Sequence, residues 1–418
     1  MLSLGVAMFI RIVLITGLTV FAPFAVADQL RLDDAMNLAA VNQPLLAGQR
    51  ALIDADRQAE VADRQLPDPK LKLGVSNVPV DTYSLTQDGM TQRTVSIEQS
   101  FPGGNKRELR GQLAQSETEQ SKADLAASTL DVKRAAGLAW LDLYYPLQAL
   151  HLLHEQQHAY QQQIAAARIS YRANKGSQAE VLGLQNGLNQ LLDKELEFKA
   201  QAERARALLA RWIGAEAKRE LANQLPNYPP PATLSRLDAQ LGQHPEIRKL
   251  DQAIVSAKTD VALAREASKP DWSVELGYSK RGPAYADMVS AQIAVDLPVF
   301  PGNRQDRTSA ARQFLLSKAR YQREDRLRSM QADLAAAYAE WQAATSRIAL
   351  LQKSTVPDAA QRISAALIDY GTSASGMGDV FEAHHAMLDA NLQLLAQRVA
   401  QARARVQLSY FSGEENSK

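Results

Sequence analysis

Three histidines are spaced so that one helix face would carry all of them. His151, His154 and His158 stand at i, i+3 and i+7, a spacing that puts the rings on the same face of a helix. Imidazole nitrogens are ligands for Zn²⁺, Cu²⁺ and Ni²⁺. The chain has no cysteine, and Glu155 is the one carboxylate beside them in the sequence. These residues are weak metal candidates, and we favour histidines that are solvated or packed between helices.

A second group with possible chemistry is acidic. Asp379 and Glu382 are three residues apart, so a helix would present both carboxylates on one face. They follow Gly376-Met377-Gly378, where a helix could begin. Asp379 could therefore cap that helix, and Glu382 could be a solvated acid that the helix dipole favours. A ring of such carboxylates, repeated by several subunits, would instead bind cations. The two interpretations can both hold.

Features of an enzyme or a nucleic-acid binder are missing from the sequence. Gly103-Gly104-Asn105-Lys106 is followed by Arg107-Glu108, so it lacks the Lys-Ser/Thr pair of a phosphate-binding loop. No Ser-His-Asp order, catalytic carboxylate pair or nucleotide fingerprint occurs. Lysine and arginine (47) nearly balance aspartate and glutamate (46), which argues against a nucleic-acid partner. We predict a protein that is not an enzyme and has no cofactor.

The N-terminus predicts export. A positive charge and the apolar residues 12–26 lead to Ala25-Val26-Ala27, the order of a secretory signal peptide over residues 1–27. Translation could begin at Met1 or at Met8. The alternative is an uncleaved anchor, but the apolar run is short for a membrane span. No other segment approaches 18 consecutive apolar residues, so a position in a membrane would have to rest on β-strands.

The chain contains an internal repeat of roughly 200 residues. The landmarks that recur in the same order are Pro67-Asp68 with Pro270-Asp271, Phe101-Pro102-Gly103 with Phe300-Pro301-Gly302, Trp140 with Tyr338, and Tyr171 with Tyr370. The two halves should therefore share one fold. We divide the mature chain into a first repeat (28–224), a Pro-rich linker (225–232), a second repeat (233–411) and a C-terminal tail (412–418).

Each half is expected to be mainly helical with two short strands. Apolar residues at steps of 3 and 4 predict long antiparallel coiled-coil helices, one of them from Asn105 to about Lys175 with a possible kink at Pro146. Four segments alternate between apolar and polar residues as strands do, with one face for lipid and one for water. They are residues 70–77, 92–101, 272–279 and 287–299. Four strands leave open edges, so we expect three copies to pool about 12 strands.

This plan resembles the TolC family of outer membrane factors over essentially the whole mature chain. The motifs that carry the resemblance, closest to the heavy-metal efflux branch, are residues 66–69, 77–81, 90–91 and 98–107. The resemblance implies a homotrimer in the outer membrane of a Gram-negative bacterium, with a 12-stranded β-barrel continued by a helical tunnel in the periplasm. Many members are tethered by a lipidated cysteine, which this chain lacks.

The resemblance also implies site residues. The stretch from Tyr370 to Glu382 is similar to the one where the family narrows its periplasmic end with acidic rings. The implied residues are the gate acids Asp379, Glu382 and Glu180, their partners Tyr370, Arg168 and Arg172, and an adaptor docking region near Gly176 and Gly376.

The function that follows from the resemblance is passive conduction of substrate out of the cell. An inner-membrane pump, expected to be of the RND type, and a periplasmic adaptor (a membrane fusion protein) would deliver heavy-metal cations such as Cu, Ag, Co, Zn or Cd, and outer-membrane lipid would surround the strands. Drug efflux and type I secretion are alternatives within the family. A periplasmic coiled-coil adaptor or scaffold is an alternative from another class, but it would need β-rich domains around a single helical hairpin.

Overall fold

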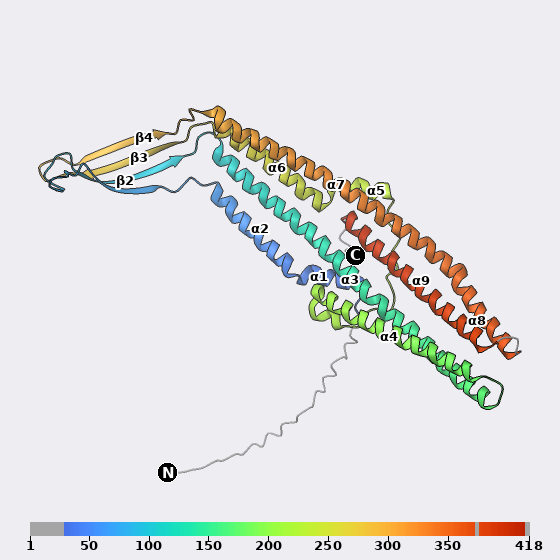
Figure 1. The fold of residues 1–418 in the computed structure, drawn as a ribbon. Helices are drawn as coiled ribbons and strands as arrows, with labels where there is room; N and C mark the ends of the chain where they lie inside the picture. Colours follow the sequence, from blue (N-terminus) through green and yellow to red (C-terminus); the bar gives the residue numbers. More distant parts are fainter. Residues whose placement is uncertain (1–28, 373–375, 414–418) are drawn as a thin grey trace, which may run out of the picture.

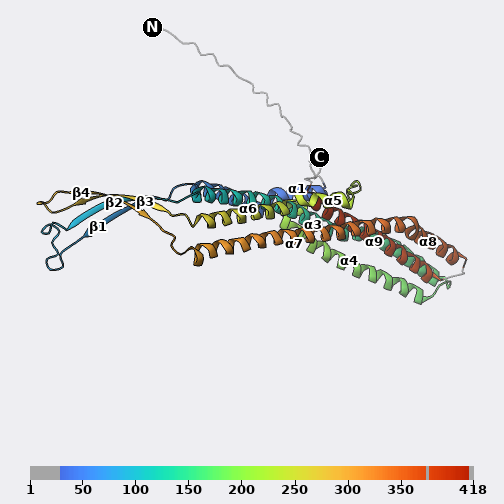
Figure 2. The same cartoon turned by 90° about the horizontal axis from the view of Figure 1, so that it is seen from above.

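The computed structural model describes residues 29–372 and 376–413 as an elongated molecule with a small sheet at one end and helical hairpins at the other (Figure 1). The predicted signal peptide and residues 414–418 of the predicted tail lie outside the described residues. Seen from above, the sheet and the long helices follow one another along a single axis (Figure 2). The chain therefore separates its β part from its helical tip by the length of its longest helices.

The two halves have the same order of elements. The first half contains α1 (Leu32–Asn42), α2 (Pro44–Asp63), β1 (Lys70–Ser76), β2 (Gln92–Phe101), α3 (Lys106–Arg172), α4 (Gln178–Ile213) and the 3₁₀ turn η1 (Gly214–Lys218). The second contains α5 (Leu234–Gln240), η2 (Leu241–Gln243), α6 (Pro245–Glu266), β3 (Trp272–Lys280), β4 (Met288–Val295), η3 (Pro301–Asn303), α7 (Gln305–Leu350), the π-helical turn η4 (Leu351–Thr355), α8 (Val356–Gly371) and α9 (Met377–Ser412). The exact repeat boundaries remain a prediction.

The four strands form one antiparallel sheet in the order β1-β2-β3-β4. The pairing of β2 with β3 joins the two halves, with Phe101 opposite Trp272 and their rings stacked at 4.4 Å. The predicted strand 287–299 was too long at its end, because β4 stops at Val295. Prolines at 298 and 301 have no N–H to donate to a ladder.

The two faces of the sheet differ in polarity. Leu73 and Val289 are 73% and 80% exposed on the apolar face. On the polar face, Glu98 and Glu275 stand opposite each other in register, and Lys72 pairs with both carboxylates. The lysine offsets a cross-strand repulsion. Among the helices of the described residues, none is long and apolar enough to cross a membrane.

The longest helix is continuous through a proline. α3 has 67 residues, which corresponds to about 100 Å at 1.5 Å per residue, and Pro146 lies inside it without ending it. The corresponding helix of the second half is interrupted. There, η4 follows α7, and Pro357 stands in the first turn of α8, where its missing N–H has little effect.

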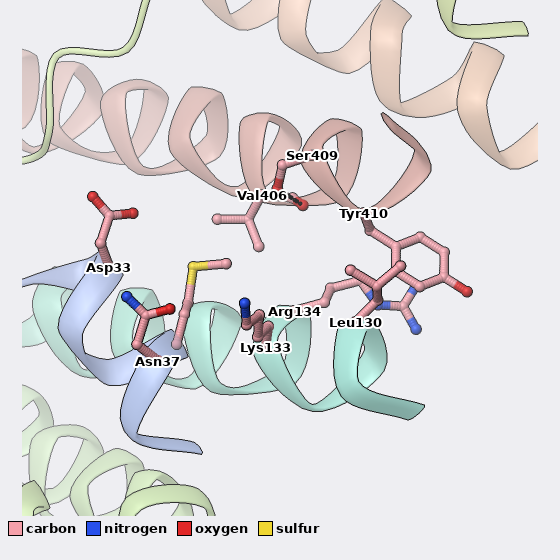
Figure 3. A pocket seen from close by; sticks show the side chains of 9 residues that line it. Asp33, Asn37, Leu130, Lys133, Arg134, Val406, Ser409 and Tyr410 are labelled. Carbon is pink, nitrogen blue, oxygen red and sulfur yellow. Dashed lines mark hydrogen bonds between the residues drawn. The ribbon is translucent and has the colours of Figure 1, made fainter. Parts of the chain in front are cut away.

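Three helices enclose a small cavity midway along the molecule. Its lining includes Asp33 and Asn37 of α1, Lys133 of α3 and Tyr410 of α9, which Figure 3 shows beside Arg134. The Arg134 guanidinium lies 4.2 Å from the centre of the Tyr410 ring. With a volume of about 30 Å³, the cavity has room for about one water molecule. It is therefore a packing feature rather than a substrate site.

One buried histidine joins α6 to the end of α9. His244 is 2% exposed, its Nε2 lies 3.0 Å from the Tyr410 carbonyl oxygen, and its Nδ1 accepts a hydrogen bond from the Glu246 backbone N–H at 3.2 Å. Burial lowers the pKa of His244, while its hydrogen bond to Tyr410 and the nearby acids Glu246 and Asp131 act in the opposite direction. The neutral ring, with Nε2–H as donor and Nδ1 as acceptor, fits both bonds.

We expect His244 to make stability pH-dependent. Its pKa is lower in the folded chain than the value of 6.5 that applies when unfolded, so the unfolded chain takes up the proton first. The stabilisation is complete above about pH 6.5 and is lost as the pH falls below it. Apparent melting temperatures from pH 5 to 8 should fall on the acid side, and His244→Asn, which keeps a capping acceptor, should flatten that slope. An equal slope in both proteins would contradict this assignment.

Candidate functional site

The helical tip is formed by two turns, one in each half. The first leads from α3 to α4 and includes Asn174 in the left-handed region at φ 57°. Ser177 then caps α4, because its hydroxyl accepts a hydrogen bond from the Glu180 backbone N–H at 3.2 Å. The second turn leads from α8 to α9, and Gly376 stands at its helix cap without a side chain to offer. The start of α9 therefore needs a partner from elsewhere.

Glu180 provides that partner. Its Oε1 accepts a hydrogen bond from the Met377 backbone N–H at 3.1 Å. A carboxylate at this place satisfies a free N–H of the first turn and interacts favourably with the helix dipole. Glu180 thus caps α9 from α4 and ties the two hairpins together. The sequence suggested an acidic gate residue here, and a role in capping was not foreseen.

Removing this carboxylate should loosen the start of α9. We expect Glu180→Ala to cost about 0.5–2 kcal/mol, the range of a lost helix cap, with the effect confined to the tip. Hydrogen exchange of the backbone amides of residues 377–380 would measure it. Glu203→Ala, an exposed position farther along α4, is the matched control, and equal exchange in the two variants would rule the cap out.

The other two gate acids are exposed on the first turns of α9. Asp379 donates its backbone N–H to the Gly376 carbonyl oxygen at 3.2 Å, and its carboxylate lies where the helix dipole favours a negative charge. Among the described residues, neither Asp379 nor Glu382 forms an ion pair. Both charges are therefore available to solvent, to cations or to a neighbouring subunit.

Within the part of the chain that the structure describes, the predicted gate partners form no hydrogen bond or ion pair with these acids. Arg168 and Arg172 are exposed on α3, and Arg168 donates a hydrogen bond to Gln185 of α4 at 3.3 Å. Tyr370 is half-buried against the apolar cluster at the tip. The docking glycines differ as well. A side chain at Gly176 would crowd the Glu180 carboxylate at 3.3 Å, whereas the nearest described atom to a Cβ at Gly376 is the Gly378 nitrogen at 4.0 Å.

A cleft of about 500 Å³ separates α4 from α9 just behind the tip. Its lining includes Glu180, Gln190, Met377, Glu382 and His385. The cleft thus brings together a thioether, two carboxylates and an imidazole that are far apart in the sequence. Asp379 lies close to Met377 in the sequence but does not line the cleft.

An aromatic contact that the sequence did not reveal packs α9 against α3 and α4 near the tip. Phe381 of α9 lies edge-on to Tyr160 of α3, with ring centres 5.3 Å apart. Gly187 of α4 makes room for the ring, since a Cβ there would lie 2.1 Å from a Phe381 ring carbon. Burial, together with the charges of Glu382 and Asp389, raises the pKa of Tyr160. The one available sequence signal was a glycine inside a helical stretch.

The histidines of α3 do not form a shared site. His151 Nε2 lies 3.4 Å from Glu155, and His154 Nε2 lies 3.5 Å from Glu195 of α4. The Glu195 carboxylate pairs with the Lys199 ammonium at 2.5 Å. This contact is the main cause that lowers the pKa of Glu195 to about 2. Within residues 29–372 and 376–413, no three His, Cys, Asp or Glu side chains converge as a metal-binding group.

The comparisons with known proteins agree with this architecture. Residues 237–414 match the model of the family described as outer membrane efflux protein. The cobalt-zinc-cadmium resistance protein CzcC of Cupriavidus metallidurans is 24% identical over 393 residues, which cover 91% of this chain and 89% of CzcC. The second half of the chain thus matches the outer membrane efflux protein family, and the chain as a whole is similar to CzcC.

Solved structures of channel and outer-membrane proteins share the fold of this chain. The structure of CusC is 16% identical, with a TM-score of 0.78 and 93% of each chain covered. VceC of Vibrio cholerae is 18% identical, with a TM-score of 0.76, covering 91% of this chain and 96% of VceC. CmeC of Campylobacter jejuni is 14% identical, with a TM-score of 0.77, covering 93% of this chain and 87% of CmeC.

The comparisons bear on several of the expectations. The fold of duplicated helical hairpins and four strands is confirmed, and so is a place in the outer membrane with the helical part in the periplasm. The family is one of efflux channels rather than enzymes, and its channels are trimers that work with adaptor and pump partners. The alternative of a periplasmic adaptor requires β-rich domains around a single helical hairpin, whereas the described residues form two hairpins and one four-stranded sheet.

Proposed function

We propose that the protein is the exit duct for heavy-metal cations in a tripartite efflux system. The observation that carries the proposal is the likeness to CzcC, a cobalt-zinc-cadmium resistance protein, which extends over nine-tenths of the chain. The exposed acids at the tip support it, since carboxylates attract divalent cations. A pump of the RND type and a membrane fusion protein would deliver the cations, and outer-membrane lipid would cover the exposed apolar face of the sheet.

The acids Asp379 and Glu382 are proposed to form the gate when three subunits repeat them. Both acids are exposed and form no ion pair among the described residues, so they are free to bind cations or to pair with Arg168, Arg172 or Tyr370 of a neighbouring copy. Glu180 would contribute indirectly, through its cap on α9. The adaptor would dock near Gly176 and Gly376, where the absence of a side chain lets a partner approach the backbone.

The substrate class can be tested in a bacterial host that lacks its own duct but carries a heavy-metal pump and adaptor. Adding this chain should raise the tolerated concentrations of Zn²⁺, Co²⁺ and Cd²⁺ several-fold. A parallel host with a drug pump and its adaptor tests the alternative within the family. Restored drug tolerance without any gain in metal tolerance would show that the substrate is not a metal cation.

The gate can be tested on the purified channel in planar bilayers. We expect Asp379→Ala/Glu382→Ala to raise the conductance several-fold or to lower its preference for cations, because three copies of two negative charges are removed from the tip. Asp358→Ala/Glu340→Ala removes the same charge from exposed positions outside the tip and is the control. Equal conductance and selectivity in the two double variants would exclude this gate.

A further inference from the structure

One histidine on the cleft is held by a carboxylate. His385 Nδ1 lies 3.1 Å from Asp389 Oδ2, one helical turn farther along α9. Asp389 is in turn 3.9 Å from the Lys194 ammonium of α4. Because a carboxylate accepts hydrogen bonds, the imidazole donates from Nδ1 and keeps its free electron pair on Nε2. A carboxylate behind an imidazole fixes the orientation of the ring, the arrangement found behind histidines that bind metals.

A second donor lies on the same side of the helix. Glu382 precedes His385 by three residues, so both side chains lie on one face of α9, and both line the cleft of about 500 Å³. A Glu-x-x-His pair on one helix face is a ligand set that helical metal proteins use. Lys194 offsets the charge of Asp389 and leaves that of Glu382 unpaired.

We propose that Glu382 and His385 Nε2 form a transient binding site for divalent transition-metal cations on their way through the duct. This inference rests on the proposed function and adds a ligand with nitrogen chemistry to the acidic tip. An imidazole favours Zn²⁺, Co²⁺ or Cu²⁺ over Mg²⁺ and Ca²⁺, which prefer oxygen ligands alone. The site would therefore select among cations, whereas carboxylates by themselves select mainly for charge.

A site with two protein ligands suits a metal ion that passes through the duct rather than one that stays bound. Two donors from one chain leave the other coordination positions to water, in keeping with the absence of a three-ligand group among the described residues. Conduction requires sites that bind well enough to admit an ion and weakly enough to release it. Asp389 is a positioning residue here, since it acts on the metal through His385.

The test uses Cu²⁺ as the probe on the detergent-purified trimer, prepared without a histidine tag. A background variant, His151→Ala/His154→Ala/His158→Ala, removes the exposed histidines of α3. Electron paramagnetic resonance then reports whether an imidazole nitrogen coordinates the ion. We expect the background protein to show that signature and His385→Gln to lose it, with at least a tenfold loss of affinity.

Two further variants separate a ligand from a structural role. Asp389→Asn should weaken Cu²⁺ binding by about 10-fold and keep the nitrogen signature, as expected behind a metal ligand. His384→Gln is the matched control. It is the adjacent residue, turned about 100° away on the helix, and it does not line the cleft, so its loss should leave binding unchanged. Size-exclusion chromatography confirms that each variant remains a trimer.

The inference and the proposed function can fail separately. If His385→Gln binds Cu²⁺ like the background protein, or if His384→Gln removes the signature instead, the site is wrong even where the chain confers metal tolerance. If the signature follows His385 but the chain restores only drug tolerance in the two-host experiment, the metal-duct function is wrong and the binding site stands.

Discussion

Gly187→Val is expected to push α9 away from α4 and to open the helical tip. The Cβ alone would lie 2.1 Å from a ring carbon of Phe381 and 2.8 Å from one of Tyr160, and valine adds two methyl groups beyond it. Tyr160 is 1% exposed, so its ring has no free space to enter. Phe381 must therefore leave its place, at a cost of about 1–3 kcal/mol or more for the overpacked site. The start of α9, with its acids, would move with it.

The measurement is the single-channel conductance in planar bilayers, together with the apparent melting temperature in detergent. We expect a higher conductance and a lower melting temperature. Gly183→Val is the matched control, because Gly183 lies one turn earlier on α4 and no atom stands within 4 Å of its Cβ position. Both variants place the same β-branched residue in the same helix.

A second variant keeps the prediction testable if Gly187→Val fails to assemble. Phe381→Leu removes the outer ring atoms that meet the new side chain, so it should restore part of the melting temperature when added to Gly187→Val. A normal conductance in Gly187→Val, or the same loss in Gly183→Val, would show that the contact of Phe381 with Gly187 does not hold the tip closed.

Much of the fold could be predicted because its signals are local. The four strands alternate between apolar and polar residues, and the long helices repeat apolar residues at steps of 3 and 4. Each element can therefore be recognised from its own stretch of sequence. The duplication added a check, since Phe101 and Phe300 occupy corresponding places. The errors concern ends and interruptions. β4 stops early at Val295, and the π-helical turn Leu351–Thr355 was not predicted.

The contacts of the tip could not be predicted in the same way. Glu180 and Met377 are nearly 200 residues apart, and so are Gly187 and Phe381. Each pair depends on how two hairpins lie against each other, which no local pattern encodes. Glu180 was suggested as a member of an acidic ring through its place in the repeat. That same repeat, with Ser177 in one half and Gly376 in the other, explains why α9, unlike α4, takes its cap from a distant residue.

Trp140→Ala should produce the largest loss of stability in the chain. Trp140 of α3 is fully buried, its ring stacks on Tyr144 at 5.1 Å, and its Nε1–H donates to the Leu30 carbonyl oxygen at 3.0 Å. Removing the ring leaves a large cavity, and such substitutions cost about 3–5 kcal/mol. The hydrogen bond accounts for the smaller part, because the Leu30 oxygen also accepts from the Ala222 N–H at 3.1 Å.

This division can be measured with two variants. Trp140→Phe keeps much of the ring and loses the donor, so we expect its apparent melting temperature to fall much less than that of Trp140→Ala. Trp212→Ala, at a partly buried position of the same core, is the control for losing a tryptophan. If Trp140→Phe fell as far as Trp140→Ala, the hydrogen bond to Leu30 would outweigh the packing. The stability of the core would then depend on the hydrogen bond that holds Leu30 in place, next to Leu221, with which Leu30 forms a parallel β-bridge.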